Sequence, residues 1–322
     1  MAAVEIDGSE GEGGGQVLRT SLTLSAITKK PVRITNIRAN RPNPGLQMQH
    51  LTSARAVRSV CRGKLTGAEP KSTELVFEPG EIVGGRYEFD IGTAGSVTLV
   101  AQTLIPILLG AAKESELRIS GGTHVMKSPG YDYFEHVFVP AIARFGAQVG
   151  TTLIKPGYYP RGGGCMDVII RPSKLLGCII WPKEENVQAL IRLSNLPEGI
   201  AVREKKVFVQ NGTTDVHIRN DQSLSVGNAV TCWKGFRGAY VLGQVGKRAE
   251  TVAQEALDML KAEKNEVDVH LADQLLIYAA LAEGRTAYTS GGISGHFRTN
   301  ASIIAKFVER DIREEGGCVS IS

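Results

Sequence analysis

The sequence predicts an α/β protein, of the α+β kind, built from repeated units of strands and helices. Over roughly residues 1–80, strand-like and helix-like segments follow the order strand, helix, strand, helix, strand, strand. The same order returns over residues 87–172, and the parts of a third copy are separated by a different segment. A repeat of this length indicates a duplicated supersecondary unit and not a solenoid.

The elements of the first two units follow from hydrophobic spacing, which alternates in strands and has a 3.6-residue period in helices. In the first unit, strands are expected at residues 3–6, 31–37, 64–68 and 73–79, and helices at 16–28 and 44–60. In the second, strands are expected at 87–91, 115–120, 147–154 and 165–172, and helices at 94–112 and 129–145. A Pro-Gly pair opens the second helix of both units.

The third unit begins at residues 175–182 and then breaks off. Its remainder is expected as helices at 270–284 and 299–316 and strands at 286–291 and 318–322. Between them lie strand-like stretches at 186–196, 213–220 and 229–245 and one amphipathic helix at 249–263. We therefore expect a large repeat domain, residues 1–182 plus 266–322, with a small α/β domain, residues 183–265, inserted in the third repeat.

Composition is that of a soluble globular protein, with 42% hydrophobic and 22% charged residues. The five cysteines form no CxxC pair, so neither a zinc site nor a disulfide framework is indicated, and a cytoplasmic location is expected. No signal peptide or membrane-spanning run is expected. Within residues 1–62, lysine and arginine outnumber the acids nine to four, which suits an anionic ligand or a solvated basic face.

The stretch GEGGGQ, residues 11–16, places four glycines before a helix. Backbone N–H groups at a helix N-terminus bind phosphate, and glycines let the phosphate come close. Glu12 lies inside this loop, and a carboxylate beside phosphate is typical where a divalent cation lies between them. A glycine-rich turn with a solvated glutamate explains the same pattern.

Two further polar clusters flank predicted helices. Arg38 and Arg41 follow a strand end and Gln49 lies on the next helix; an arginine fork suits phosphate, although surface salt bridges are an equal alternative. His270, Asp273 and Gln274 share one face of a helix, where they read a base or ribose or simply complement the helix dipole.

His296 lies in SGGISGHFRTN, residues 290–300, on a glycine-rich approach to a helix whose N-cap is expected at Thr299 or Asn300. A phosphate at such a helix end would lie beside the imidazole, whose neutral nitrogen can attack phosphorus. A general base, a metal ligand and a plain surface histidine remain alternatives.

Together these stretches resemble the RNA 3′-terminal phosphate cyclase family. The matching segments are GEGGGQVLRTSL, NIRANRPNPGLQMQHLT, IGTAGSVTLVAQTLIP, GYYPRGGG, LADQLL and GHFRTN. They cover nearly the whole chain in the family's order. The resemblance implies three βαβαββ-type repeats, forming a large domain similar to that of the enolpyruvyl transferases, and a small α/β insert.

The resemblance also implies an activity, the ATP-dependent conversion of an RNA 3′-phosphate end to a 2′,3′-cyclic phosphate. A histidine attacks the α-phosphate of ATP, AMP passes to the RNA 3′-phosphate, and the neighbouring 2′-hydroxyl closes the ring and releases AMP. RNA is required because DNA lacks that hydroxyl. A divalent cation, Mg²⁺ or Mn²⁺, is implied as a cofactor beside ATP.

Carried over by position, His296 is the nucleophile and Glu12 contacts the metal. Arg19, Arg38, Arg41 and Gln49 match polar residues near the phosphates, and Gln102, His270, Leu271, Ala272, Asp273 and Gln274 match adenylate-binding positions. Position 270 is tyrosine in some members and histidine here. The stretch around His124 is acidic in some members, so no role is assigned to His124.

Two other classes of protein share this architecture. A catalytically silent relative that acts in ribosome assembly lacks the nucleophilic histidine, so His296 argues against it. An enolpyruvyl transferase needs no covalent nucleotide, and the motifs around His296 and His270 would have no use in it.

Overall fold

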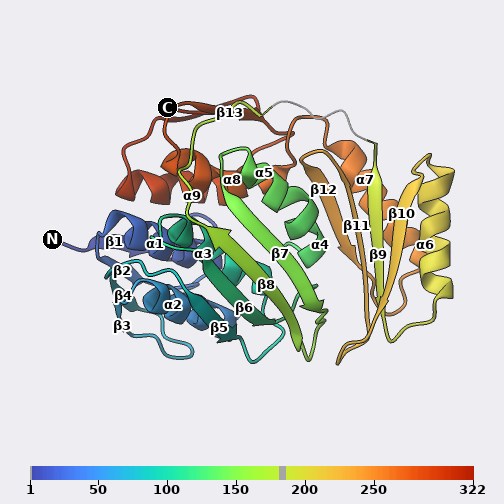
Figure 1. The fold of residues 1–322 in the computed structure, drawn as a ribbon, viewed down its shortest axis with the longest axis horizontal. Helices are drawn as coiled ribbons and strands as arrows, with labels where there is room; N and C mark the ends of the chain where they lie inside the picture. The colour runs from blue at the N-terminus through green and yellow to red at the C-terminus, as the bar shows by residue number, and fades with distance from the viewer. Residues whose placement is uncertain (1, 181–185) are drawn as a thin grey trace.

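The computed structural model describes residues 2–180 and 186–322, and its first two sheets share one topology (Figure 1). The first sheet, in the order β1-β2-β4-β3, contains β1 (Val4–Asp7), β2 (Val32–Thr35), β3 (Lys64–Thr66) and β4 (Leu75–Glu78). The second, in the order β5-β6-β8-β7, contains β5 (Arg86–Asp90), β6 (Ser115–Gly121), β7 (Gln148–Lys155) and β8 (Gly164–Arg171). In both sheets the first two strands are parallel and the other neighbours antiparallel.

A third sheet, in the order β13-β15-β14, repeats the last three positions of this topology with antiparallel neighbours. It contains β13 (Thr286–Thr289), β14 (Ile312–Glu315) and β15 (Cys318–Ile321). The missing first position is taken by single bridges from Leu176 to Glu283 and from Ile179 to Ala287, so the expected strand over 175–182 is reduced to isolated contacts. Residues 181 and 182 of that strand lie outside the described part of the chain. The predicted mixed α/β fold of three related units is confirmed.

The helices of the three units pack against one another and the sheets lie around them (Figure 1). They are α1 (Gly15–Thr28), α2 (Met48–Val60), α3 (Val97–Leu109), α8 (Val269–Leu281) and α9 (Gly295–Phe307), with α4 (Tyr131–Tyr133), the π-helix η1 (Phe134–Phe138) and α5 (Val139–Ala143) forming one continuous segment. Helix α1 contacts α2, α3 and α9, which brings parts of all three units to one centre. No helix among the described residues is both long and apolar enough to span a bilayer.

Between the Ile179–Ala287 bridge and α8, the chain forms a separate α/β unit, residues 188–262, called here the inserted unit. Its sheet has the order β10-β9-β11-β12, with β9 (Gln188–Ser194), β10 (Asp215–Asp221), β11 (Gly227–Lys234) and β12 (Arg237–Leu242). Helices α6 (Gly199–Gln210) and α7 (Ala249–Ala262) pack on this sheet over an apolar cluster of its own. Figure 1 shows the unit at one end of the molecule.

Three expectations about local structure were wrong. Helix α6 was not predicted, because few of its side chains are fully buried and one of these, Glu204, is charged, so its apolar period is weak. The predicted helix over 299–316 ends at Phe307, and Ile312 instead pairs with Ile321 across β14 and β15. The cap of α9 is Ser294, whose Oγ accepts from the Phe297 N–H, since the helix begins before Thr299.

Candidate active site

Four helices direct their N-termini at one cavity of about 1010 Å³. The first turns of α1, α2, α8 and α9 contribute Gly15, Gln49, His270 and His296 to its lining. The peptide dipoles place about half a positive charge at each helix N-terminus, and α1, which begins after Gly14, has no side-chain cap for its first N–H groups. The convergence of the four N-termini makes the cavity a site for anionic ligands, and the glycine-rich turns of the sequence lead into it.

His296 and Glu12 meet at the centre of this arrangement. The His296 Nδ1 atom lies 3.1 Å from the Glu12 Oε2 atom, and the two side chains are 39% and 38% exposed. The contact depends on Gly295, since a Cβ at that position would lie 2.4 Å from the Glu12 Oε1 atom. The glycine before His296 therefore makes room for the carboxylate that orients the imidazole.

The charge of His296 is set by opposing neighbours. Partial burial lowers the pKa of His296 from its ordinary value, and the cations Arg19 and Arg41 act in the same direction, while Glu12 opposes them. A lowered pKa keeps the ring neutral at physiological pH. A neutral ring with Nδ1 turned to Glu12 leaves the Nε2 lone pair free for chemistry.

The Thr-Asn pair after His296 ties α9 to the glycine-rich loop. Thr299 Oγ1 accepts from the Glu12 N–H at 3.3 Å, and Asn300 Oδ1 accepts from Thr20 Oγ1 at 2.6 Å. Asn300 also donates to the backbone carbonyl of Asp273 on α8. The sequence placed this pair at the helix cap; in the structure it joins three helices around His296.

The three predicted arginines differ in what they are free to do. Burial lowers the pKa of Arg19 to about 10, and its guanidinium lines the cavity. Arg38 Nη1 donates to backbone carbonyls of the 43–45 loop. Arg41 Nη2 donates to the backbone carbonyl of Glu12 at 3.0 Å and lies 3.8 Å from that residue's carboxylate. All three line the cavity, with Arg38 also supporting its wall.

A row of amides links three of the helices. Gln49 Oε1 accepts from the Ser96 N–H at 2.7 Å, which leaves its amide group to the cavity. Gln102 Nε2 donates to Gln274 Oε1 at 2.6 Å, and Gln274 Nε2 donates to the His270 carbonyl at 2.9 Å. Residues distant in the sequence therefore form one polar wall.

Comparison with known proteins assigns the family. Residues 10–313 match the family model described as RNA 3′-terminal phosphate cyclase. The chain belongs to the RNA 3′-terminal phosphate cyclase family. It is similar to the RNA 3′-terminal phosphate cyclases of Archaeoglobus fulgidus, with 42% identity and 99% of each chain covered, and Pyrobaculum aerophilum, with 42% identity and 95% and 93% covered. The family makes the chain an enzyme, as the sequence predicted.

Two solved structures are also similar. The enolpyruvyl transferase NikO from Streptomyces tendae has a TM-score of 0.44 and 12% identity, covering 100% of this chain and 48% of that one. The EPSP synthase from Acinetobacter baumannii has a TM-score of 0.44 and 14% identity, covering 99% of this chain and 48% of that one.

Within this cyclase-family cavity, the residues of the LADQ segment divide by whether they face the cavity or the core. Leu271 and Ala272 are buried in the core and do not line the cavity, whereas Asp273 does. Burial, helped by the nearby Asp268, raises the pKa of Asp273 to about 7. Its Oδ2 accepts from Ser294 Oγ at 3.4 Å, so the first turns of α8 and α9 are joined beside His296.

His50 is not among the predicted site residues, yet it lines the cyclase-family cavity and is 8% exposed. Its Nδ1 accepts from the Gln47 N–H, and a Cβ on Gly15 would lie 2.2 Å from its Nε2. Burial lowers the pKa of His50 to about 3, with Arg19 and Arg38 adding to the effect. Its signal in the sequence is its place in the first turn of a helix after a polar loop. A position on a helix does not by itself identify a residue of the site.

Proposed function

We propose that the protein converts an RNA 3′-terminal phosphate into a 2′,3′-cyclic phosphate at the expense of ATP, through a covalent AMP on His296. The observation that carries the proposal is the His296–Glu12 pair, held in a cavity where four helix N-termini converge. Family membership supports the overall activity. The covalent route rests on the chemistry of this pair.

In the first step, His296 Nε2 attacks the α-phosphorus of ATP. An N–P bond forms, the bridging P–O bond to the β-phosphate breaks, and pyrophosphate leaves. Because Nδ1 retains its proton, the ring gains positive charge as the bond forms. Glu12 at 3.1 Å from Nδ1 stabilises that charge and holds the ring in one orientation.

The remaining steps use the RNA end. An oxygen of the 3′-phosphate attacks the phosphorus of the histidine adduct, so AMP moves to the RNA and His296 returns to the neutral form. The adjacent 2′-hydroxyl then attacks the activated 3′-phosphorus, a P–O bond closes the ring, and AMP leaves. The hydroxyl is held next to its target by the ribose itself, which supplies a high effective concentration.

The cations of the cavity are suited to the phosphates of both substrates. Arg19 and Arg41 line the cavity around His296, and Arg38 lines it beside them. A guanidinium offers paired N–H donors that match phosphate oxygens. Together with the helix N-termini, these groups offset the negative charge of a triphosphate and an RNA end in one space.

The adenylate is expected at the polar wall of α3 and α8. Gln102, His270, Asp273 and Gln274 line the cavity there, and their amides and carboxyl supply both donors and acceptors. The exposed imidazole of His270 is a surface on which a purine can stack. Leu271 and Ala272 contribute by packing the helix in place.

A divalent cation fits this donor set only together with the nucleotide. Among residues 2–180 and 186–322, no three His, Cys, Asp or Glu side chains form a metal cage. Mg²⁺ is commonly held by one or two carboxylates plus substrate phosphates and water, which Glu12 can satisfy. Bound there, the cation would neutralise phosphate charge.

The test is labelling with ATP carrying the label on its α-phosphate, in the presence of Mg²⁺ or Mn²⁺. We expect label to remain on the protein, labile to acid and stable to alkali, as phosphoramidates are. The His296→Ala variant should lose it while folding normally, as judged by circular dichroism. Full labelling of His296→Ala would show that another residue is the nucleophile.

A second test separates the RNA steps. RNA with a 3′-phosphate but a 2′-deoxy last sugar should accumulate as the adenylated end, because no hydroxyl is present to close the ring. The matched all-ribose RNA should give cyclic product. Cyclic product from the deoxy substrate would contradict the mechanism.

A further inference from the structure

The inserted unit forms part of the wall of the active-site cavity. Tyr240 and Leu242 from β12, and Met259 from α7, line the same space as His296. Lys247, just after β12, also lines it. The shape of the cavity therefore depends on how the inserted unit sits against the repeat units.

The buried carboxylate of Asp268 lies where these parts meet. It is 1% exposed and caps α8, accepting from the backbone N–H groups of His270 and Leu271 at 3.0 and 2.8 Å. It also accepts from the Tyr133 hydroxyl, at 2.9 and 2.8 Å to its two oxygens, and from the Gly238 N–H at 2.9 Å. One side chain thus joins the third unit, the second unit and the inserted unit.

The partners of Asp268 reach the cavity themselves. Tyr133, Gly238 and His270 all line it. The fit is close, since a Cβ on Gly238 would lie 2.8 Å from the Tyr133 ring. Beyond the two bonds that cap α8, Asp268 therefore makes bonds that link α8 to the second unit and to the inserted unit.

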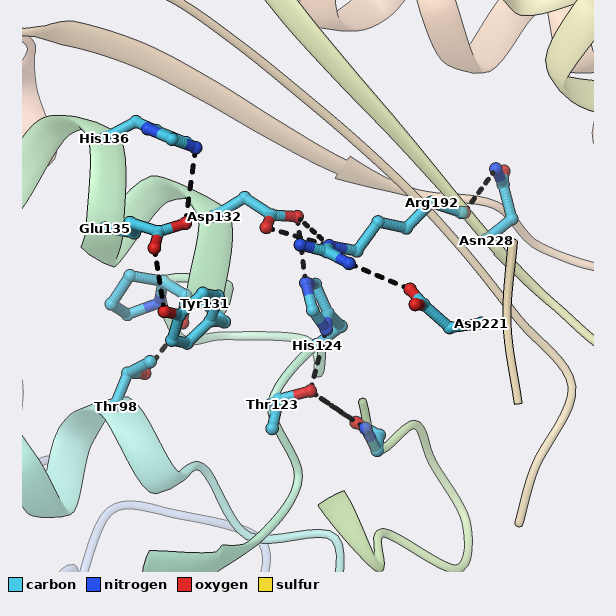
Figure 2. A network of polar contacts seen from close by, with 12 residues as sticks. Thr98, Thr123, His124, Tyr131, Asp132, Glu135, His136, Arg192, Asp221 and Asn228 are labelled. Atoms are coloured by element: carbon cyan, nitrogen blue, oxygen red, sulfur yellow. Dashed lines mark hydrogen bonds and ion pairs between the residues drawn. The ribbon is translucent and has the colours of Figure 1, made fainter. Parts of the chain in front are cut away.

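A second buried contact holds the inserted unit beside Asp268. Asp132, the neighbour of Tyr133, accepts from Arg192 Nε at 2.8 and 2.9 Å, and Arg192 continues to Asp221 at 2.8 Å (Figure 2). His124 Nε2 lies 3.1 Å from Oδ2 of the same carboxylate. Thr123, His124 and Asp132 contact one another in the hydroxyl–imidazole–carboxylate order of a catalytic triad. All three are buried and none lines the cavity, so they act as structural supports.

We propose that Asp268 is a positioning residue that sets the inserted unit's wall of the cavity against the first turn of α8, and so controls nucleotide binding. The inference rests on the proposed adenylation. Loss of the bonds to Tyr133 and Gly238 lets β12 shift relative to His270 without touching His296 or Glu12. Nucleotide affinity therefore falls while the chemistry, once the nucleotide is bound, continues.

Two variants test this by separating the cap of α8 from the bonds that Asp268 makes to Tyr133 and Gly238. Asp268→Asn keeps an oxygen for the α8 N–H groups, and asparagine is a good N-cap, but its NH₂ group cannot accept from Gly238. Tyr133→Phe removes only the hydroxyl. For both we expect the ATP concentration that gives half-maximal labelling to rise severalfold, because part of the binding free energy then goes into holding β12 in the binding arrangement, with the maximal labelling rate little changed.

The matched control is Tyr288→Phe. The Tyr288 hydroxyl is also buried and also bonds α8, at the Ala272 carbonyl, but it joins no second unit. It should lower thermal stability to a similar extent and leave half-saturation by ATP unchanged. Equal shifts in half-saturation for Tyr133→Phe and Tyr288→Phe, or none for Asp268→Asn, would overturn the proposal.

Hydrogen exchange provides a readout that needs no adenylation. Amides of β12, residues 237–242, should exchange faster in Tyr133→Phe than in the wild type, and no faster in Tyr288→Phe. If the wild type takes no label, the proposed function fails while this exchange result still reports on the junction. If labelling is normal and β12 exchange is the same in all three proteins, the positioning role of Asp268 is wrong.

Discussion

The cavity and the Asp132–Arg192 contact, at the junction between the second unit and the inserted unit, use the same kinds of charged group in opposite ways. At the cavity, Glu12 lies 3.1 Å from His296 and 3.8 Å from Arg41, and all three side chains are more than a third exposed. At the junction, Asp132 is fully buried, Arg192 is 10% exposed, and their atoms are 2.8 Å apart. Solvated pairs exchange partners easily when a charged ligand arrives, whereas buried pairs hold one geometry. Between these two sets of charged groups, solvent exposure and not residue type is what differs.

The largest effect is expected from breaking the buried pair. Arg192→Met leaves Asp132 without its main cation in the interior, so the free energy of unfolding should fall by about 3–5 kcal/mol. Urea unfolding followed by circular dichroism measures it. The double variant Arg192→Met with Asp132→Leu should recover part of the loss, because the fully buried carboxylate is gone, while the part-exposed Asp221 and the buried His124 each lose a partner. A loss below about 1 kcal/mol for Arg192→Met would mean that the junction tolerates an unpaired charge as a surface does.

A buried carboxyl group that lacks a paired cation should have the opposite effect, because its ionisation lowers the free energy of unfolding. Glu204 in α6 is fully buried, accepts from Asn228 Nδ2 through Oε2, and has no hydrogen-bond partner for Oε1 among the described residues. Burial raises the pKa of Glu204 from 4.5 to about 7. Between these values the folded state keeps a proton that the unfolded state releases, so this carboxyl lowers stability as pH rises to about 7 and adds no further change above.

Glu204→Gln removes that dependence. The variant's stability relative to the wild type should increase from about pH 5 to about pH 8 by roughly 2–3 kcal/mol, and most of the increase should come below pH 7. Urea unfolding of both proteins across this range isolates the effect, since other groups titrate equally in each. A difference that does not change with pH would show that Glu204 is ionised throughout.

The smallest effect on stability is expected at the cavity. Arg41→Met should lower the free energy of unfolding by less than about 1 kcal/mol, since its ion pair is half-exposed and long. Labelling at low ATP should nevertheless fall severalfold, because the group is suited to phosphate. Arg33→Met is the matched control, as Arg33 pairs with Glu74 on the surface at 2.7 Å and does not line the cavity. Arg33→Met should leave labelling unchanged and should lower the free energy of unfolding by no more than Arg41→Met does. Equal losses of labelling in the two variants would contradict the comparison.

Much of the fold was open to prediction because its signals are local and repeated. Strands such as Val32–Thr35 and helices such as Gly15–Thr28 alternate or repeat in hydrophobicity as their burial requires. Helix Gly199–Gln210 was missed because it buries few apolar residues. The strand at Ile312–Glu315 was taken for helix because Ile312 continues the spacing of α9, and only its pairing with β15 decides otherwise.

The candidate site was predictable in its parts and not in its contacts. Glycine-rich turns before helices identified the stretches around Glu12 and His296, since such turns let a phosphate come close to the N–H groups at a helix N-terminus. That Nδ1 of His296 faces Glu12, and that Asn300 bonds Thr20, depends on segments about 280 residues apart. His50 has only a weak local signal, its place in a first helical turn, because its burial and its lowered pKa arise from neighbours on other elements.

The sequence by itself determined the repeated α/β units, the family resemblance and the residues with reactive side chains, because spacing and residue type are properties of the chain. The tertiary structure alone decided which of these residues share a cavity and which are buried supports. Asp268 and Asp273 lie in one short segment, yet the first is enclosed among three units and the second opens on the cavity. Both carboxyl groups are buried, at 1% and 7% exposed, so the packing of distant elements decides which of them faces the cavity and which faces only other parts of the protein.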